Sequence, residues 1–309
     1  MSEQSLLWAA FGLLMVIMLV IDLGMNRTAH HISFRQACIW SIVWVTLALA
    51  FIAGIYATLG HTKALEFLTG YIIEKSLSVD NLFVFIMIFS YFNIRDEHQA
   101  RILKWGILGA LVLRGLFIYI GVELFTAFNW MFYLFGFLLL YTAWKMAFGG
   151  DDKLDPESNL LVTLARRFFP FTKRVRGDWF FTRRRGRLMA SPLLLALLMV
   201  ESSDVLFALD SIPAIFAVTL DPFIVFTSNI FAIMGLRALY FLLAGMASIF
   251  IYLKPAIAFI LAFIGGKMIA GAGGLHIPIQ ISLSVIFVSL ALAIAASLFM
   301  DKKRAVNIR

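Results

Sequence analysis

The chain has 309 residues, of which 62% are hydrophobic and only 14% are charged, and its mean hydropathy is +0.93. Soluble globular proteins carry about 25% charged residues, so this composition excludes an ordinary water-soluble domain and indicates an integral membrane protein. The net charge of +8 is unevenly distributed, and the single cysteine, Cys38, excludes an internal disulfide framework.

Apolar segments of about 20 residues are long enough to cross the hydrocarbon core as helices. Such segments are predicted at 6–24, 37–59, 64–92, 102–122, 128–148, 188–219, 222–248, 254–271 and 277–299. The N-terminal sequence MSEQSLLWAA lacks the basic region of a cleavable signal peptide, so we expect the first segment to remain as a helix. The sequence therefore predicts an all-α polytopic membrane protein with about nine transmembrane helices.

Basic residues follow every second predicted span. Arg27 follows the first span, Arg95 the third and Lys254 the seventh, and DKKRAVNIR follows the ninth. The loop at 149–187, after the fifth span, is rich in arginine. It could bind nucleic acid or anionic lipid, but a signal for membrane orientation is favoured because the loop lies where the positive-inside rule needs it. We therefore expect an outside N-terminus, an inside C-terminus and no nucleic-acid partner.

An internal repeat relates two parts of the chain. The segments that resemble each other are SVDNLF (78–83) and SSDVLF (202–207), LRGLF (113–117) and LRALY (236–240), and GFLLLYTAWKM (136–146) and FIGGKM (263–268). Each predicted repeat holds three spans, an odd number, so the second copy must enter the membrane from the opposite side. Inverted repeats are a recurring transporter architecture, with the substrate site near the bilayer midplane. We expect one transmembrane domain, with repeats at 64–148 and 188–271, the cytoplasmic linker 149–187 between them, and a final helix at 277–299.

Carboxylates stand inside the matching spans of both repeats. A carboxylate at a helix centre costs about 2.5–3.5 kcal/mol, and such residues normally face the bundle interior and mark an ion or proton pathway. At about 100° per residue, Glu74, Ser78 and Asn81 share one helix face in the first repeat. Glu201 and Asp204 share a face in the second repeat.

Asp80 and Asp210 point away from those faces in a regular helix. Pro213 removes a backbone donor and clashes with the carbonyl of Leu209, next to Asp210. We therefore expect the sixth span to be kinked or broken there, which would let Asp210 or nearby carbonyl oxygens join the site.

Two arginines, Arg114 and Arg237, lie near the middle of their spans, and each could neutralise one of the acids in a structural ion pair. Several buried acids would remain, and a divalent cation would satisfy them. Carboxylate, amide and hydroxyl ligands suit Mn²⁺, Mg²⁺ or Ca²⁺, whereas the histidines fall in loops or at span ends, which disfavours zinc and copper. The candidate metal ligands are Glu74, Asp80, Asn81, Glu201, Asp204 and Asp210, and the supporting residues are Ser78, Ser202, Arg114, Arg237 and Pro213.

The segments TGYIIEKSLSVDNLFVF, ESSDVLFALDSIPAIFAVT and DPFIVFTSNIFAIMGLRALYFLL resemble the signature segments of the TerC family, most closely its Alx branch of bacterial inner-membrane proteins. The resemblance covers almost the whole chain. It implies a multi-pass inner-membrane protein associated with manganese efflux, and some members are associated with tellurium resistance or with metalation of exported enzymes. By resemblance, the metal and transport residues are Glu74, Asp80, Glu201, Asp204 and Asp210.

Spacing alone indicates a divalent-cation or proton transporter, and manganese comes from the resemblance. An intramembrane aspartyl protease is disfavoured because the chain has no GxGD motif. A non-transporting partner that supplies metal to exported proteins, and a proton-only pathway, remain alternatives. We expect a secondary transporter that exports Mn²⁺ by alternating access, with protons as a possible counter-ion, and neither enzymatic activity nor a cofactor. The sequence leaves the oligomeric state open.

Overall fold

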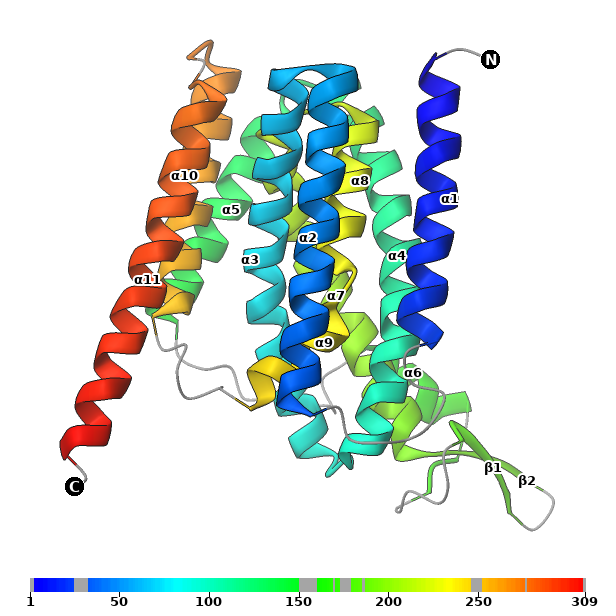
Figure 1. Ribbon diagram of the computed structural model, residues 1–309. Coiled ribbons are helices and arrows are strands. Elements are labelled where there is room, and N and C mark those ends of the chain that lie inside the picture. Colours follow the sequence, from blue (N-terminus) through cyan, green and yellow to red (C-terminus); the bar gives the residue numbers. More distant parts are fainter. Residues whose placement is uncertain are drawn as a thin grey trace.

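The computed structural model describes residues 3–24, 33–149, 160–168, 170–172, 179–184, 187–245, 252–275 and 277–307. Its helices are α1 (Glu3–Gly24), α2 (Phe34–Leu59), α3 (His61–Tyr91), α4 (Asp96–Ala127), α5 (Met131–Phe148), α6 (Leu160–Phe168), α7 (Pro192–Phe216), α8 (Pro222–Ile233), α9 (Leu236–Ala244), α10 (Leu253–Ala272) and α11 (Ile279–Asn307). The long helices stand side by side in one bundle, with the two termini at opposite ends (Figure 1).

Two strands, β1 (Phe181–Arg184) and β2 (Arg187–Ala190), form an antiparallel hairpin in which Phe181 pairs with Ala190. Helix α6 and strand β1 fall in the predicted basic linker, whereas most of β2 covers the first residues of the predicted sixth span, whose helix begins only at Pro192. The hairpin and α6 lie at the same end of the bundle as the α3–α4 connection (Figure 1). Other parts of that linker, at 150–159, 169, 173–178 and 185–186, and Arg27 in the first basic loop lie outside the described residues. The inside and outside assignment stays a prediction.

Seven helices in the described part of the chain have the length and composition of a membrane span: α1, α2, α4, α5, α7, α10 and α11. The pair α8 and α9, bent by 41° at a short break, makes an eighth if it is counted as one span. The predicted count of about nine is one higher than these eight, and the difference is the helix α3. Five charged residues, at 63, 66, 74, 75 and 80, lie along α3 and exclude it from the count, although it runs beside α2 through the bundle (Figure 1).

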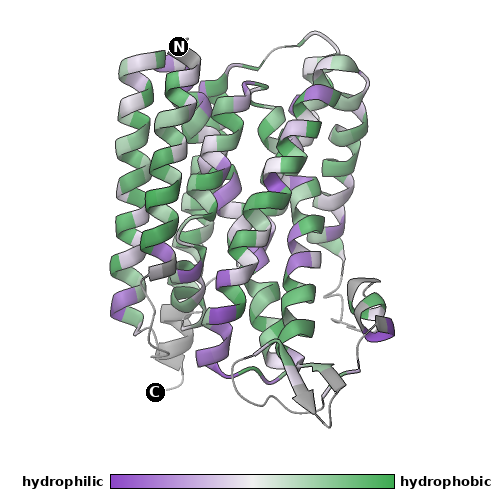
Figure 2. Ribbon diagram, turned by 90° about the vertical axis from the view of Figure 1, so that its right-hand side faces the viewer, coloured by the Kyte–Doolittle hydropathy of each residue, from purple (hydrophilic) through white to green (hydrophobic). Residues whose placement is uncertain are grey.

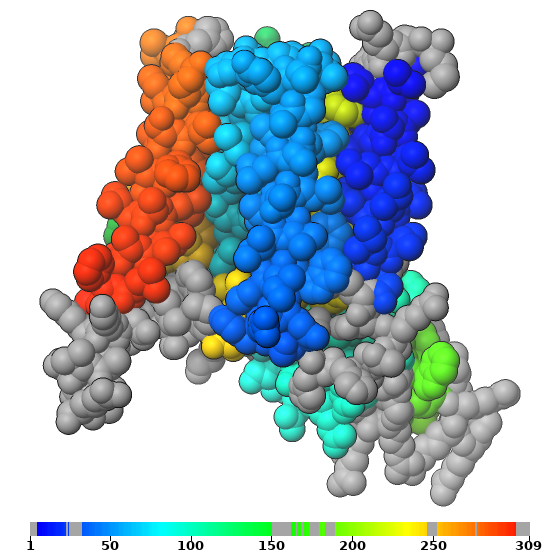
Figure 3. Space-filling model, viewed as in Figure 1, coloured from blue at the N-terminus to red at the C-terminus, as the bar shows by residue number. Residues whose placement is uncertain are grey.

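The outer surface of the bundle is apolar. Figure 2 shows hydrophobic residues along the height of the helices, and Figure 3 shows α11, α2 and α1 across one face. Large hydrophobic side chains that are more than half exposed occur on these outer helices and on α5, among them Leu13, Ile42, Phe137, Trp144 and Phe287. Such a surface would be an aggregation hazard in water and is suited to lipid. The structure thus agrees with the predicted all-α polytopic membrane protein.

The charged helix α3 lies at the centre of the fold, where it contacts α2, α7, α8, α9, α10 and α11. Helices α4 and α7 pack on each other, as do α5 and α10. In Figure 1, α3 and α7 run in opposite directions, and so do α4 and the α8–α9 pair, and α5 and α10. An inverted repeat requires this relation, and the repeat itself stays a prediction.

Of the two outcomes predicted at Pro213, the break is wrong, because α7 continues as one helix from Pro192 to Phe216, and the kink stays a prediction. Proline removes a single backbone hydrogen bond, to the carbonyl four residues earlier, and a helix can tolerate that loss. The helix ends soon afterwards, and the N–H of Ala217 donates to the carbonyl of Pro213. The interrupted helix is instead the seventh predicted span, which is divided between α8 and α9.

Candidate ion site at the bundle centre

The guanidinium of Arg114, on α4, is fully buried and joins two carboxylates from different parts of the chain. Its Nη2 and Nε donate to the two carboxylate oxygens of Asp204 on α7, at 2.8 and 3.2 Å. Its Nη1 donates to Oε1 of Glu74 on α3 and, at 3.1 Å, to Oδ1 of Asn229 on α8. Four helices therefore meet at one arginine, and we call Glu74, Arg114, Asp204 and Asn229 the central cluster.

The central cluster carries more negative than positive charge, since one guanidinium faces two carboxylates. Ser78 donates to Oε1 of Glu74 at 3.3 Å, one helical turn away. Oε2 of Glu74 and Nδ2 of Asn229 are buried and have no hydrogen-bond partner among the described residues. Because an unpaired buried polar atom is costly, this pattern marks a place where a further ligand, ion or water would be stabilised.

Glu201 lies beside the central cluster on the same face of α7 as Asp204, as the helical spacing predicts. Its carboxylate packs against Gly109 of α4, so closely that a Cβ atom on that glycine would clash with both carboxylate oxygens. A small void of about 20 Å³ adjoins Asp204 and is also lined by Gly106, Val200 and Leu236. A void of this size has room for about one water molecule.

The other predicted ligands do not join the cluster. Asp80 is partly buried on α3 and interacts electrostatically with Lys254 at the start of α10. Asp210 is partly buried on α7 and accepts a hydrogen bond from Oγ1 of Thr142, on α5, at 3.0 Å. Asn81 is buried on α3, one turn beyond Ser78. Within the described residues, no three acidic, histidine or cysteine side chains converge to hold a metal ion.

Arg237, the repeat counterpart of Arg114, has a different partner. Its Nη2 donates to the backbone carbonyl of Asp22, at the end of α1, and lies 3.6 Å from the Asp22 carboxylate. Both side chains are buried. Arg237 therefore ties α1 to α9 and leaves the central cluster to Arg114. Ser202, beside Glu201, is partly buried on α7.

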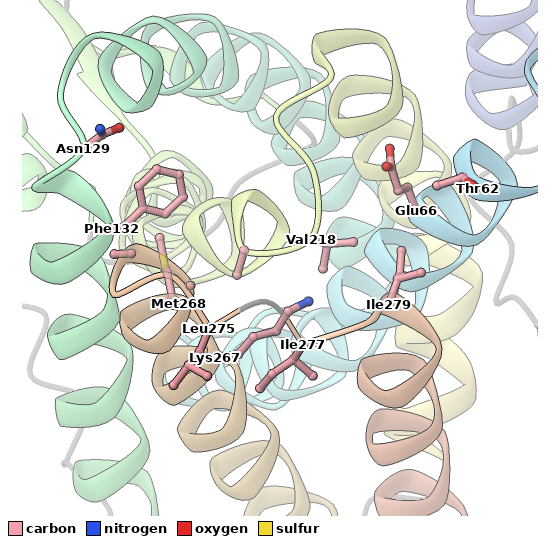
Figure 4. Close-up of a pocket in the computed structure, with 13 residues that line it drawn as sticks. Thr62, Glu66, Asn129, Phe132, Val218, Lys267, Met268, Leu275, Ile277 and Ile279 are labelled. Atoms are coloured by element: carbon pink, nitrogen blue, oxygen red, sulfur yellow. The ribbon is translucent and has the colours of Figure 1, made fainter.

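A pocket of about 480 Å³ lies where α3 and α11 begin and α10 ends (Figure 4). These helix ends are at the end of the bundle opposite the hairpin (Figure 1). Glu66 and Lys267 lie on different walls, and the rest of the lining combines the polar residues Thr62 and Asn129 with apolar side chains such as Phe132, Met268 and Ile279 (Figure 4). Oε2 of Glu66 accepts from Thr219 at 2.7 Å and from a neighbouring lysine. None of the predicted metal ligands lines this pocket, so it is separate from the central cluster.

Sequence reasoning missed two polar residues of the interior. Asn229 lies in the apolar run DPFIVFTSNIF. An isolated amide inside a predicted span was the signal that could have identified it as a candidate site residue. Lys75, next to Glu74 on α3, was not among the predicted site residues. In the structure its Nζ donates to the carbonyls of Ala232 and Met234, at 3.1 and 3.4 Å, where α8 ends.

Comparison with known proteins gives the chain its relatives. Residues 59–305 match the family described as "Integral membrane protein TerC family". An uncharacterized membrane protein of Myxococcus xanthus is 50% identical over 297 residues, which cover 96% of this chain and 93% of that protein.

Two further relatives carry the name "Putative membrane-bound redox modulator Alx". The Salmonella typhi protein is 49% identical, with 98% of this chain and 97% of that protein covered, and the Escherichia coli K12 protein is 50% identical, with 91% of each covered. No solved structure matches the chain. The family match and these identities show that the chain belongs to the TerC family of integral membrane proteins.

Proposed function

We propose that the protein is a secondary transporter that exports a divalent cation, Mn²⁺, from the cytoplasm across a bacterial inner membrane. The observation that carries the proposal is the buried pair Glu74 and Asp204, which come from the two predicted repeats and share a single arginine, Arg114. Buried carboxylates inside a membrane bundle normally belong to an ion or proton pathway.

The central cluster supplies the donor types that Mn²⁺ prefers. Glu74, Asp204 and Asn229 offer carboxylate and amide oxygens, and hard divalent ions are bound by such oxygens. Arg114 already satisfies one oxygen of Glu74 and both oxygens of Asp204. Oε2 of Glu74 is unpaired among the described residues and can bind a divalent ion, and the oxygens of Asp204 become available to that ion when the guanidinium shifts away from them.

The acids outside the cluster have a role in the same proposal. Glu201 flanks the cluster. Asp80 lies on α3, where it interacts with the charge of Lys254, and Asp210 lies on α7, where it accepts a hydrogen bond from Thr142. Rocking of the two repeats about the midplane would change which acids face Arg114 and from which side water reaches them. Carboxylates released in this way can take up a proton, which would make the proton the counter-ion. Manganese, export and the inner membrane follow from the family resemblance.

Two alternatives stay open, namely a partner that hands metal to exported proteins without transport and a proton-only pathway. The name of the Alx relatives describes those proteins as redox modulators. This chain has one cysteine, Cys38, so it cannot cycle between a dithiol and an internal disulfide. A redox role would therefore require a second chain or a bound group, whereas the central cluster needs neither.

Flux in proteoliposomes separates these functions. We expect the purified protein to move Mn²⁺ down its gradient across the vesicle membrane, measured with a manganese-quenched dye trapped inside, and a pH dye should report coupled proton movement. Binding of Mn²⁺ without flux would favour the metal-donating partner. Proton flux that neither needs Mn²⁺ nor responds to it would favour the proton pathway, and either result would contradict export.

A further inference from the structure

The break between α8 and α9 lies inside the bundle. Helix α8 ends at Ile233, Met234 is extended with ψ 133°, and Gly235 takes the left-handed conformation with φ +78°. Ala232, Ile233 and Met234 are fully buried. An interrupted helix leaves carbonyl groups at its C-terminal end without their usual donors, and the helix dipole makes that end negative. The end of α8 is therefore a buried group of acceptors.

The ammonium of Lys75 fills this position. Its Nζ donates to the Ala232 carbonyl at 3.1 Å and to the Met234 carbonyl at 3.4 Å. Lys75 and Glu74 are consecutive on α3, and consecutive helical side chains diverge by about 100°. Glu74 therefore reaches the central cluster while Lys75 reaches the break, and α3 places a charge in each.

The break has a cause other than Lys75. A left-handed residue costs a glycine little, and Gly235 lies against Trp44 of α2, where an added Cβ would be 2.5 Å from the ring atom Cδ1. Beyond the break, Arg237 holds α9 to the end of α1. Since backbone conformation and these contacts shape the break, its carbonyls should stay in place when the lysine side chain is removed.

We propose that the C-terminal end of α8 is a cation-binding position, which the Lys75 ammonium occupies in this conformation and which a small free ammonium or alkali cation occupies when that side chain is absent. Carbonyl oxygens at the C-terminal ends of interrupted membrane helices coordinate small cations in secondary transporters. The inference is independent of manganese export, because it depends only on the break and on its present occupant.

Chemical rescue tests the proposal on the purified full-length protein. Lys75→Ala should lower the thermal midpoint Tm, and ethylammonium chloride should raise it again by a few degrees, because an ion that binds only the folded state stabilises it. Tetraethylammonium chloride at equal ionic strength has no N–H donors and should not do so. The Tm of the wild-type protein should change by the same amount in both salts.

Lys267→Ala is the matched control, because Lys267 also lies within a helix of the bundle but has no side-chain partner among the described residues. Its Tm should show no preference between the two salts. Equal responses of Lys75→Ala to both salts, or the same preference in Lys267→Ala, would overturn the proposal.

A second pair of variants decides the question if Lys75→Ala cannot be purified. Lys75→Arg keeps a positive donor near the carbonyls, whereas Lys75→Met keeps most of the length and the apolar stem without the charge. If the end of α8 binds cations, Lys75→Arg should have a higher Tm than Lys75→Met and should be recovered in larger amounts in detergent. A methionine variant as stable as the arginine variant, or more stable, would contradict the proposal.

Discussion

Arg114 and Asp204 are joined by two hydrogen bonds, from Nη2 and Nε of the guanidinium to the two oxygens of the carboxylate. This bidentate pair links α4 to α7 and brings together the two predicted repeats. The same guanidinium also reaches Glu74, so its removal would leave two uncompensated carboxylates in a buried place. The pair therefore bears on both the stability of the bundle and the ion pathway.

Arg114→Met should destabilise the folded protein strongly. Breaking a buried ion pair by removing one partner costs about 3–5 kcal/mol, because the remaining charge stays buried. Unfolding of the detergent-solubilised protein by heat or denaturant measures the loss. Arg95→Ala is the control, because the Arg95 side chain is 80% exposed, and surface substitutions change stability by about 0.5 kcal/mol or less. Equal stability of the two variants would contradict the buried role of Arg114.

Gly109→Ala should displace the Glu201 carboxylate, because an added Cβ would clash with it. Glycine is about 1 kcal/mol less favourable than alanine inside a helix, so this gain offsets part of the strain and the overall stability should change little. If Glu201 serves the ion pathway, Mn²⁺ flux should nevertheless fall. Gly12→Ala, where a Cβ would meet nothing within 4 Å, should leave flux unchanged.

A double-variant cycle checks that this effect acts through Glu201. When Glu201→Gln is already present, adding Gly109→Ala should lower flux by less than it does in the wild type, because the two changes affect one carboxylate. Independent, multiplying effects would show that Gly109 acts elsewhere.

Thr142→Val should weaken the contact between α5 and α7. The threonine hydroxyl donates to Asp210, and a hydrogen bond to a charged group contributes about 1.5–3 kcal/mol. Unfolding measurements should show a loss toward the lower end of that range, since Asp210 is only partly buried. In the Asp210→Asn background the same change should cost less. Thr46→Val, whose hydroxyl bonds only a carbonyl of its own helix, is the control and should change stability little.

Arg237→Met should loosen α1. Arg237 holds the end of that helix through Asp22, whereas the first half of α1 packs on α8 through contacts of Trp8 and Phe11 with Phe223. Amide hydrogen exchange should become faster in α1, while exchange in α5 and α10, which pack on each other, should stay as in the wild type. Faster exchange spread evenly over all helices would argue instead for a general loss of stability.

Much of the fold could be predicted because apolar length and charged loops are local properties of a sequence. The face shared by Glu201 and Asp204 followed from helical geometry, and both residues do contact α4. The break was misplaced because Pro213 is the stronger local signal, yet it removes only one hydrogen bond. Gly235 breaks the next span because a left-handed residue can pack against Trp44, and no local pattern reveals that contact.

The partners of the arginines could not be predicted for a similar reason. Arg114 and Arg237 occupy matching places in the predicted repeat, but one meets Glu74 and Asp204 and the other meets Asp22. Spacing shows that a buried charge needs a partner without showing which helix supplies it. Asp80 and Asp210 likewise lie outside the central cluster because they interact with residues of α10 and α5, respectively, which are far from them in sequence.

The most direct test of the central claim is the rate of Mn²⁺ flux in proteoliposomes for Glu74→Gln and Asp204→Asn, compared with wild type and with Glu97→Gln. Glu97 is an exposed acid at the start of α4 and controls for the loss of one negative charge. When the vesicles contain equal amounts of folded protein, we expect Glu74→Gln and Asp204→Asn to lose most of the Mn²⁺ flux and Glu97→Gln to transport like wild type. Wild-type flux in both Glu74→Gln and Asp204→Asn would contradict the central claim.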